Sequence, residues 1–335
     1  MRRIKIRITI LILFCLVLLI PFQLAAAPFY EGKTLRIVCG SLPGGGYDRM
    51  ARLLARHLPK HIPGKPTVIV ENVPGAGSMI AAANLYNLEK PNGLVIGTFN
   101  QGLPFAQLLK AKGVRFDLMK YEWIGSTARE ASIFTVRSDL PYKSVNDLRR
   151  VKEPIPLATA GPTTMTYQFP ALLQEFAGLN FKMISYPSGT EGLLAVERKE
   201  ADGTASVYSS LKPYINRGLI RPLIRGRISA AGIENLPIDE DLTTDGRGKT
   251  LMALRSAAGS FAWPYVAPPK TSLANMTILR NAFSRSIRDP AFIADADKFG
   301  MTTEYVTAEE SMKILNFIFS QPEDVVHDFG RFIKF

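Results

Sequence analysis

The chain has 335 residues, of which 47% are hydrophobic, and a formal net charge of +12 at pH 7. This length leaves room for two domains of ordinary size, each with a buried core. The basic residues are scattered and carry no nucleic-acid-binding signature around them, so nucleic acid is not expected as a partner. The charge favours small anionic partners, and a solvated basic face is the simpler alternative.

An export signal is predicted over residues 1–27. Four basic residues precede an apolar run of about 15 residues, and small residues follow it up to Ala27. This order is typical of a secretory signal peptide; a retained membrane anchor is the alternative, because the run approaches the length that spans a bilayer. Removing the four charges from +12 leaves about +8 on the exported chain. Cys39 is then the one remaining cysteine, which excludes an intrachain disulfide and indicates a buried small apolar side chain.

Short apolar runs alternate with helical periods from residue 28 onward. We first expect strands at 35–39, 67–70 and 94–98, separated by helices at 47–57 and 78–88. A second series follows, with strands at 133–136, 155–158, 182–185, 203–207 and 219–224 and helices at 145–151, 167–177, 192–199 and 210–216. A loop is expected at 239–249, a strand at 261–267, and helices at 273–288, 290–299 and 308–320. The alternation predicts an α/β fold with mainly parallel sheets flanked by helices.

A glycine-rich loop follows the first expected strand. Residues 40–48 read GSLPGGGYD, which puts Gly44, Gly45 and Gly46 directly before a helix. Glycine lets the backbone approach a ligand, and the free N–H groups and dipole of the helix favour an anion there. The dinucleotide fingerprint requires a further glycine at position 49, where this chain has Arg49. The loop therefore predicts a carboxylate site in preference to a pyrophosphate site, and a tight turn without a ligand is the alternative.

Other motifs for cofactors and catalysis fail on their spacing. Gly248-Lys249-Thr250 resembles the end of a phosphate-binding loop, but Thr243 stands where the earlier glycine is required. His57 and His61 have helical spacing, but Pro59 between them breaks the helix that would align them. We therefore expect no cofactor, no metal site and no catalytic triad.

Two sequence blocks are specific as a pair, namely the strand–Pro-Gly-Gly-x-x-Asp–helix loop and VENVPGAG at residues 70–77. Further segments are PNG at 91–93 with GT at 97–98, SDLPYKSVNDL at 138–148, ATAG at 158–161, YPSG at 186–189 and YVAP at 265–268. Together these blocks resemble the Bug family, the periplasmic solute receptors of tripartite tricarboxylate transporters. The similarity covers nearly the whole mature chain.

The resemblance implies a two-lobed, type II-like periplasmic binding protein fold. Each lobe is expected to be a mainly parallel sheet flanked by helices, with residues 28–129 and 260–335 in lobe 1 and residues 130–259 in lobe 2. The chain is expected to cross between the lobes near 127–131 and 257–263. A small organic anion would lie in the cleft, held through backbone amides and hydroxyl groups, and the receptor is expected to be a monomer in the periplasm of a Gram-negative bacterium.

The resemblance also implies which residues form the ligand site. They lie in the loops that follow the strands and at the two crossings, and they are Ser41, Gly44, Gly45, Gly46, Tyr47, Asp48, Thr98, Asn100, Gln101, Arg129, Thr159, Gly161, Thr163, Thr164, Tyr208, Ser209 and Trp263.

Three of these assignments have alternatives. The hydroxyl-rich run at 159–164 suits a carboxylate, but one of its hydroxyl groups could instead cap the helix at 167. Arg129 is expected either to bind a second ligand carboxylate or to form a salt bridge with Glu130 or Asp48. Tyr47, Tyr208 and Trp263 either line a flat wall for an aromatic or longer acid or pack into the core.

The predicted function is non-catalytic. The chain is expected to close around a small di- or tricarboxylate or aromatic acid and to present it to membrane transporter subunits. A sensory partner of a membrane kinase would share the same residues. An exported enzyme would need an acid–base pair in the cleft, for which Asp48 with Tyr47 is the candidate.

Overall fold

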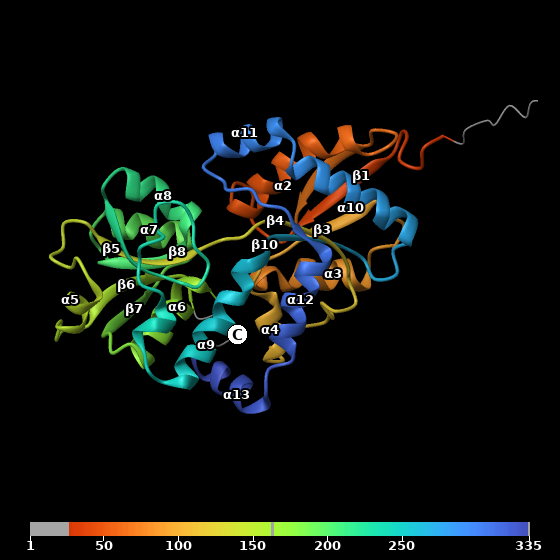
Figure 1. Ribbon diagram of the computed structural model, residues 1–335. Coiled ribbons are helices and arrows are strands. Elements are labelled where there is room, and N and C mark those ends of the chain that lie inside the picture. The colour runs from red at the N-terminus through yellow and green to blue at the C-terminus, as the bar shows by residue number, and fades with distance from the viewer. Residues whose placement is uncertain (1–26, 162–163, 334–335) are drawn as a thin grey trace, which may run out of the picture.

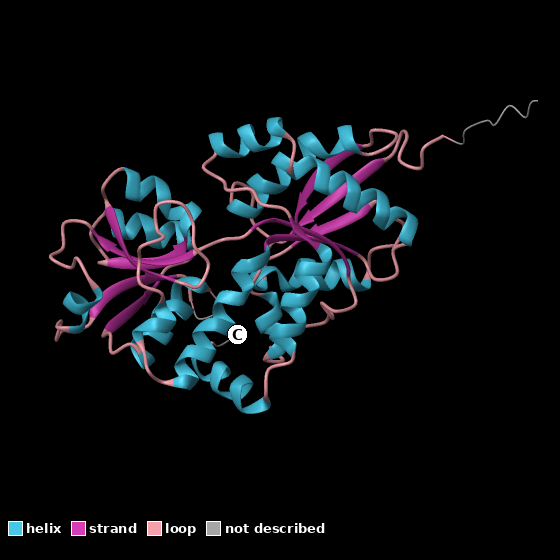
Figure 2. Cartoon of the chain, viewed as in Figure 1, coloured by secondary structure: helices cyan, strands magenta, loops and turns pink. Residues whose placement is uncertain are grey.

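The computed structural model describes residues 27–161 and 164–333, and the chain forms two mixed sheets that are flanked by helices (Figures 1 and 2). The predicted signal peptide up to residue 26, and Thr163, lie outside the described residues. In the part of the chain that the structure describes, no helix is long and apolar enough to cross a membrane.

The first unit is built on a six-stranded sheet of order β11-β4-β10-β3-β1-β2. Its strands are β1 (Thr34–Cys39), β2 (Thr67–Asn72), β3 (Val95–Thr98), β4 (Glu122–Ala128), β10 (Ala262–Ala267) and β11 (Val306–Thr307). Its helices are α2 (Gly46–His57), α3 (Met79–Asn87), α4 (Leu103–Leu108), α10 (Leu273–Ile287), α11 (Pro290–Lys298), α12 (Ala308–Phe319) and α13 (Glu323–Phe332). The strands β2, β1 and β3 pair in parallel, whereas β10 runs antiparallel to both β3 and β4.

The second unit is built on a five-stranded sheet of order β7-β6-β8-β5-β9. Its strands are β5 (Ser132–Arg137), β6 (Ile155–Thr159), β7 (Phe181–Ser185), β8 (Gly203–Val207) and β9 (Ile220–Arg225). Its helices are α5 (Val145–Arg149), α6 (Met165–Phe176), α7 (Gly189–Glu197), α8 (Tyr208–Asn216) and α9 (Gly246–Ala257). The strands β7, β6 and β8 are parallel, and β5 is antiparallel to β8 and β9. In each sheet, one strand follows directly after a crossing from the other unit, namely β10 in the first sheet and β5 in the second. This strand is antiparallel to both of its neighbours.

Both faces of the first sheet are covered, which explains why the inner residues of its central strands are mostly apolar. Val38 belongs to one hydrophobic cluster, while Ile37 and Cys39 belong to the cluster on the opposite side. This split follows from the alternation of side chains along a strand. Cys39 has no exposed surface, so the prediction of a buried small side chain is confirmed.

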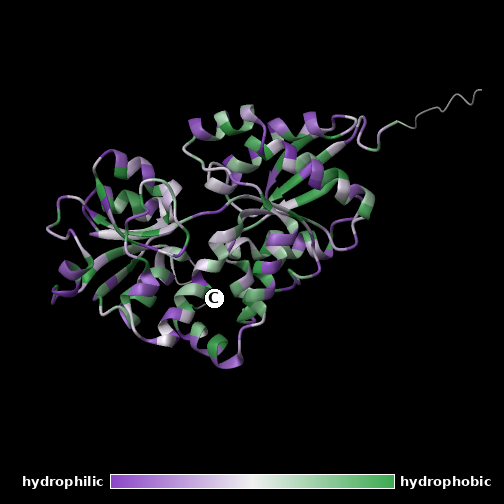
Figure 3. Cartoon of the chain, in the orientation of Figure 1, coloured by the Kyte–Doolittle hydropathy of each residue, from purple (hydrophilic) through white to green (hydrophobic). Residues whose placement is uncertain are grey.

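One hydrophobic cluster continues through the helices of both units. It includes Phe105 of α4, Phe169 of α6, Leu254 of α9, Leu315 of α12 and Phe329 of α13. In Figure 3 the apolar residues follow the strands, and the helices show mixed apolar and polar stripes. Apolar packing by these helices therefore joins the two units on one side of the molecule.

Two connections cross between the units side by side. The first runs from the end of β4 at Ala128 to the start of β5 at Ser132, and the second passes through a 3₁₀ turn (Ala258–Phe261) into β10. The Glu130 backbone N–H donates to the Gly259 carbonyl oxygen at 2.8 Å. The lobe boundaries at 129/130 and 259/260 stay a prediction, because they concern which parts move together.

The loop expected at 239–249 is confirmed only at 243–245 and is wrong at both of its ends. A 3₁₀ turn occupies Asp239–Leu242, and α9 begins at Gly246. The Asp245 side chain caps α9 by accepting from the Gly248 N–H at 2.9 Å. Two glycines near the start hide this helix in the sequence, since glycine disfavours helix formation.

The start of α12 offers a test of local stability. The Thr307 hydroxyl accepts from the Glu310 N–H at 3.1 Å, and the Glu310 carboxylate accepts from the Thr307 N–H at 2.9 Å. Thr307→Ala should lower the free energy of unfolding by about 1 kcal/mol in urea titrations, because one N–H loses its acceptor. Thr277→Ala, inside α10, is the matched control and should cost nothing, since alanine favours the helix interior. Equal effects of the two substitutions would contradict the capping role.

Candidate functional site

Asp48 organises the glycine loop after β1. Asp48 is 2% exposed, and its carboxylate accepts from the Gly44 N–H at 2.8 Å and from the Arg52 Nε–H at 3.0 Å. Burial acts to raise the pKa of Asp48, but the hydrogen bonds from Arg52, Gly44 and Asn72 outweigh it, so the pKa is lowered. Gly44 has φ +82°, a conformation that favours glycine. The hydrogen bonds to the ionised Asp48 carboxylate therefore hold the glycine loop in this conformation.

Asn72 joins the two most specific sequence blocks. Its Nδ2 donates to Asp48 Oδ1 at 2.9 Å and to the Ser41 carbonyl oxygen at 3.0 Å. The Pro-Gly-Gly-x-x-Asp loop and the Val-Glu-Asn block therefore bond directly to each other in the fold, through Asp48 and Asn72.

Ser78 ties three loops together. It is 4% exposed, its hydroxyl donates to the Gly40 carbonyl oxygen at 2.8 Å, and it accepts from the Asn100 N–H at 3.1 Å. A Cβ on Gly40 would lie 2.6 Å from the Ser78 Cβ, so this approach requires glycine. Neither Ser78 nor Asn72 was predicted as a site residue, although both lie in or next to the VENVPGAG block that signalled the family.

The N-terminus of α2 presents backbone donors beside this loop. The N–H groups of Gly46, Tyr47 and Asp48 occupy the first helical turn, where no helical acceptor is available to them. Gly45 is the N-cap and makes no side-chain cap bond. A Cβ on Gly46 would lie 3.9 Å from the Trp263 indole nitrogen, so Trp263 lies directly against the loop. Trp263 itself has φ +51°, a strained conformation for an aromatic residue.

The loop after β3 packs against Tyr47. The Gln101 N–H donates to the Tyr47 hydroxyl at 2.9 Å, and Asn100 Oδ1 accepts from the Gly102 N–H at 2.8 Å. The Thr98 hydroxyl is buried and lies next to the buried Tyr265 hydroxyl. The predicted residues of this loop thus lie next to the glycine loop, but Thr98 faces the core.

The hydroxyl groups of the loop after β6 mainly hold that loop together. The Thr164 hydroxyl donates to the Gly161 carbonyl oxygen at 2.7 Å, and the Thr166 hydroxyl accepts from the Ala160 N–H at 2.7 Å. Thr159 donates to the Ile184 carbonyl oxygen at 3.3 Å. Helix α6 begins at Met165, and Thr164 at its N-cap makes no side-chain cap bond. The expected capping role is therefore absent for Thr164.

Ser209 lies at the start of α8 and faces the first crossing. Glu130 there is 3% exposed, and its carboxyl group accepts from the Thr302 hydroxyl at 3.1 Å. Burial raises the pKa of Glu130 to about 7, while the hydroxyl groups of Ser209 and Thr302 and the Ser209 backbone amide act in the opposite direction. Glu130 and Thr302 were not predicted as site residues, because nothing local in the sequence brings them together.

The salt bridges expected for Arg129 are wrong. Its Nε lies 2.8 Å from Glu304 Oε1 and its Nη2 lies 3.1 Å from Glu310 Oε1, both in the C-terminal part of the first unit. Neither Glu130 nor Asp48 pairs with it; Asp48 pairs with Arg52 instead. Because two carboxylates already occupy the guanidinium, Arg129 anchors the crossing to the segment that leads into α12.

The three aromatic residues are largely packed into the hydrophobic clusters. Tyr208 and Trp263 are each 7% exposed, and the Tyr208 hydroxyl donates to the Ala231 carbonyl oxygen at 3.1 Å. Tyr47 is partly buried, and burial raises the pKa of its hydroxyl group. This packing favours the core interpretation for Tyr208, whereas Tyr47 and Trp263 also border the glycine loop.

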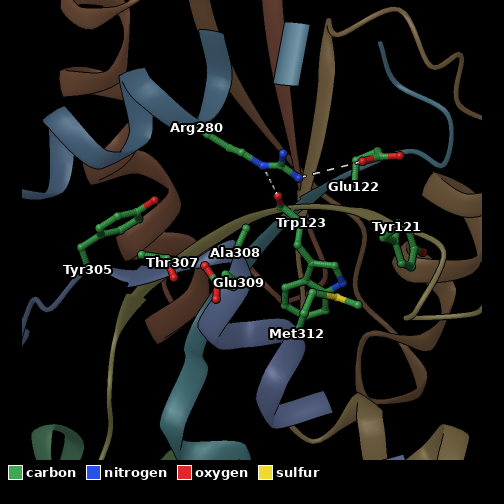
Figure 4. A pocket seen from close by; sticks show the side chains of 9 residues that line it. All are labelled: Tyr121, Glu122, Trp123, Arg280, Tyr305, Thr307, Ala308, Glu309 and Met312. Atoms are coloured by element: carbon green, nitrogen blue, oxygen red, sulfur yellow. Dashed lines mark hydrogen bonds and ion pairs between the residues drawn. The ribbon is translucent and has the colours of Figure 1, made fainter. Parts of the chain in front are cut away.

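A surface hollow of about 580 Å³ lies elsewhere, between α10, the starts of β4 and β11, and α12 (Figure 4). Arg280 Nε donates to the Trp123 carbonyl oxygen at 2.8 Å, and Arg280 Nη2 lies 4.0 Å from Glu122 Oε2. None of the predicted site residues lines this hollow. Over the described ranges, no cluster of three or more His, Cys, Asp or Glu residues is suited to a metal ion.

Comparisons with known proteins agree with this architecture. A UPF0065 protein of Cupriavidus necator is 27% identical over 298 residues, which cover 85% of this chain and 84% of that protein. The structure of the periplasmic binding protein BugD has a TM-score of 0.69 at 19% identity and covers 90% of this chain and 98% of that chain. An R. palustris protein solved with adipate has a TM-score of 0.70 at 16% identity and covers 90% of this chain and 98% of that chain.

The two-lobed periplasmic binding protein fold predicted from the sequence is confirmed by these structures, with mixed sheets in both units. The family model for the tripartite tricarboxylate transporter family receptor matches residues 50–330, which is most of the chain. The chain therefore belongs to the tripartite tricarboxylate transporter receptor family, as its resemblance to the Bug proteins predicted.

Proposed function

We propose that this protein is an exported receptor that binds a small organic carboxylate between its two units and presents it to membrane transporter subunits. The observation that carries the proposal is the glycine loop after β1, where the first N–H groups of α2 have no acceptor within the helix and the Asp48 carboxylate bonds to Gly44. Backbone amides at a helix N-terminus are strong donors for an anion.

The arrangement favours a carboxylate held mainly by neutral donors. Arg129 is paired with Glu304 and Glu310, and Arg52 is paired with Asp48, so neither guanidinium is an open partner for a ligand. The positive field of the exported chain attracts anions over a longer range. Adipate bound to a family relative of the same fold supports a dicarboxylate as the ligand class.

The same contacts argue against the enzyme alternative. Asp48 accepts hydrogen bonds from Gly44, Arg52 and Asn72, which keeps it ionised and occupied. The Tyr47 hydroxyl accepts from Gln101, and its raised pKa makes it a poor base or acid near neutral pH. We propose a monomeric receptor in the periplasm, without cofactor or metal; a sensory partner of a membrane kinase would use the same site.

A thermal-shift panel of the exported chain tests the ligand class. We would first remove any bound ligand by mild unfolding and refolding, then add succinate, malate, adipate, citrate, benzoate, aspartate or NAD. A ligand at 100 times its dissociation constant adds about 2.7 kcal/mol to the free energy of unfolding. The melting temperature should then rise by about 5 °C with at least one dicarboxylate. A higher melting temperature with NAD alone would contradict the proposal and would indicate that the glycine loop binds a nucleotide.

A further inference from the structure

The Glu130 carboxyl group lies at a junction of three segments. It belongs to the first crossing, its backbone N–H bonds to Gly259 of the second crossing at 2.8 Å, and its side chain faces Ser209 of α8 and Thr302. Ser209 belongs to the second unit, while Thr302 belongs to the C-terminal segment of the first unit. Any motion of one unit relative to the other must therefore change the surroundings of this carboxyl group.

The group is buried without a cationic partner. None of the ion pairs within the described ranges includes Glu130, and its neighbour Arg129 is directed to Glu304 and Glu310. Tyr47 of α2 is affected by the Glu130 charge, which raises the pKa of the Tyr47 hydroxyl further. The donors that remain are the Ser209 and Thr302 hydroxyl groups and the Ser209 amide. A carboxylate in such surroundings is less stable than in water, because burial disfavours the charged form.

We propose that Glu130 is a positioning residue for the candidate site. The neutral form of Glu130 favours the arrangement in which its side chain is buried between Ser209 and Thr302, and the ionised form favours separation of the two units. The sign follows from proton linkage: the arrangement that binds the proton more tightly gains population as the pH falls. In this role Glu130 acts through Ser209 and the start of α8 and does not itself contact the ligand.

This inference rests on the proposed function for its effect on binding. If ligand binding requires the units to be together, affinity for a carboxylate should be higher at low pH. Each unit of pKa difference between the separated and the joined arrangement corresponds to tenfold in the equilibrium. We expect roughly a three- to tenfold loss of affinity between about pH 6.5 and pH 8.5.

The first arm of the test needs no ligand. Ala294→Cys on α11 and Asn216→Cys on α8 place spin labels on exposed positions of the two units, and Cys39 is buried from the reagent. Distances between the labels would be measured by pulsed electron paramagnetic resonance at about pH 6.5 and pH 8.5. The long-distance population should grow at the higher pH in the labelled parent chain and stay constant in Glu130→Gln. Glu153→Gln, which changes an exposed carboxyl group in the same way, should keep the pH response of the parent.

The second arm measures calorimetric affinity for adipate and succinate over the same pH range. The parent chain should bind more weakly at high pH, and Glu130→Gln should bind equally at both values, near the low-pH affinity of the parent. A pH response of the distance with no binding of either acid would support the role of Glu130 and contradict the proposed ligand class. Distances that do not respond to pH, or that respond equally in Glu130→Gln, would overturn the role of Glu130 even if both acids bind.

Discussion

Glu130→Gln is expected to raise the free energy of unfolding by about 3 kcal/mol at pH 8 and to leave it nearly unchanged below pH 4. Burial raises the pKa of Glu130 from 4.5 to about 7 in the folded chain. Between pH 4.5 and about pH 7 the folded state therefore still binds a proton that the unfolded state has released. The free energy of unfolding falls as the pH rises through this range. Above about pH 7 the full penalty is present, since about 1.4 kcal/mol corresponds to one pKa unit. Glutamine removes the penalty because it cannot ionise.

Urea titrations at a series of pH values measure this difference. Glu153→Gln is the control, because this carboxyl group is exposed and should give no pH-dependent difference from the parent. The melting temperature of Glu130→Gln at pH 8 should exceed that of the parent by about 6 °C. A destabilised Glu130→Gln at pH 8 would show that the carboxylate form contributes more through its three donors than burial costs it.

Asp48→Ala is expected to lower the free energy of unfolding by about 3 kcal/mol and to weaken carboxylate binding at least tenfold. The substitution removes the acceptor of the Gly44 N–H and one of the two acceptors of Asn72 Nδ2. Arg52 is half exposed, so the ion pair itself contributes little, and most of the effect comes from the bonds that Gly44 and Asn72 make to the buried carboxylate. Affinity falls because the loop loses the bond that fixes Gly44 beside the start of α2.

The matched control is Arg52→Ala, which removes only the exposed partner and should cost less than about 1 kcal/mol with little change in affinity. Both variants would be compared by urea titration and by calorimetry with adipate. The lowered pKa of Asp48 adds a pH signature: its contribution is present above about pH 4 and is lost as the pH falls below its folded pKa. Equal losses in the two variants would show that the ion pair, and not the loop bonds, carries the effect.

The segments with local signals were predictable from the sequence. The apolar runs at β1, β3 and β10 and the glycine loop before α2 depend on neighbours along the chain, and each was expected close to its observed place. Helix α9 was not, because its start is glycine-containing and its apolar side chains contact α6 and α13, which lie far away in the sequence. The direction of β5 and β10 was not predicted either, since strand direction depends on pairing and not on composition.

The candidate site, too, was predictable from the sequence only in part. The sequence by itself determined the α/β class, the family and the loop in which Asp48 stands behind three glycines, because these follow from periodicity and from contiguous motifs. Only the tertiary structure decided that Asn72 bonds Asp48, that Arg129 pairs with Glu304 and Glu310, and that Glu130 is enclosed by Ser209 and Thr302. The last contact joins residues 79 and 172 positions from Glu130. No periodicity encodes such partners, and the charge state of a buried carboxyl group is set by what encloses it in space.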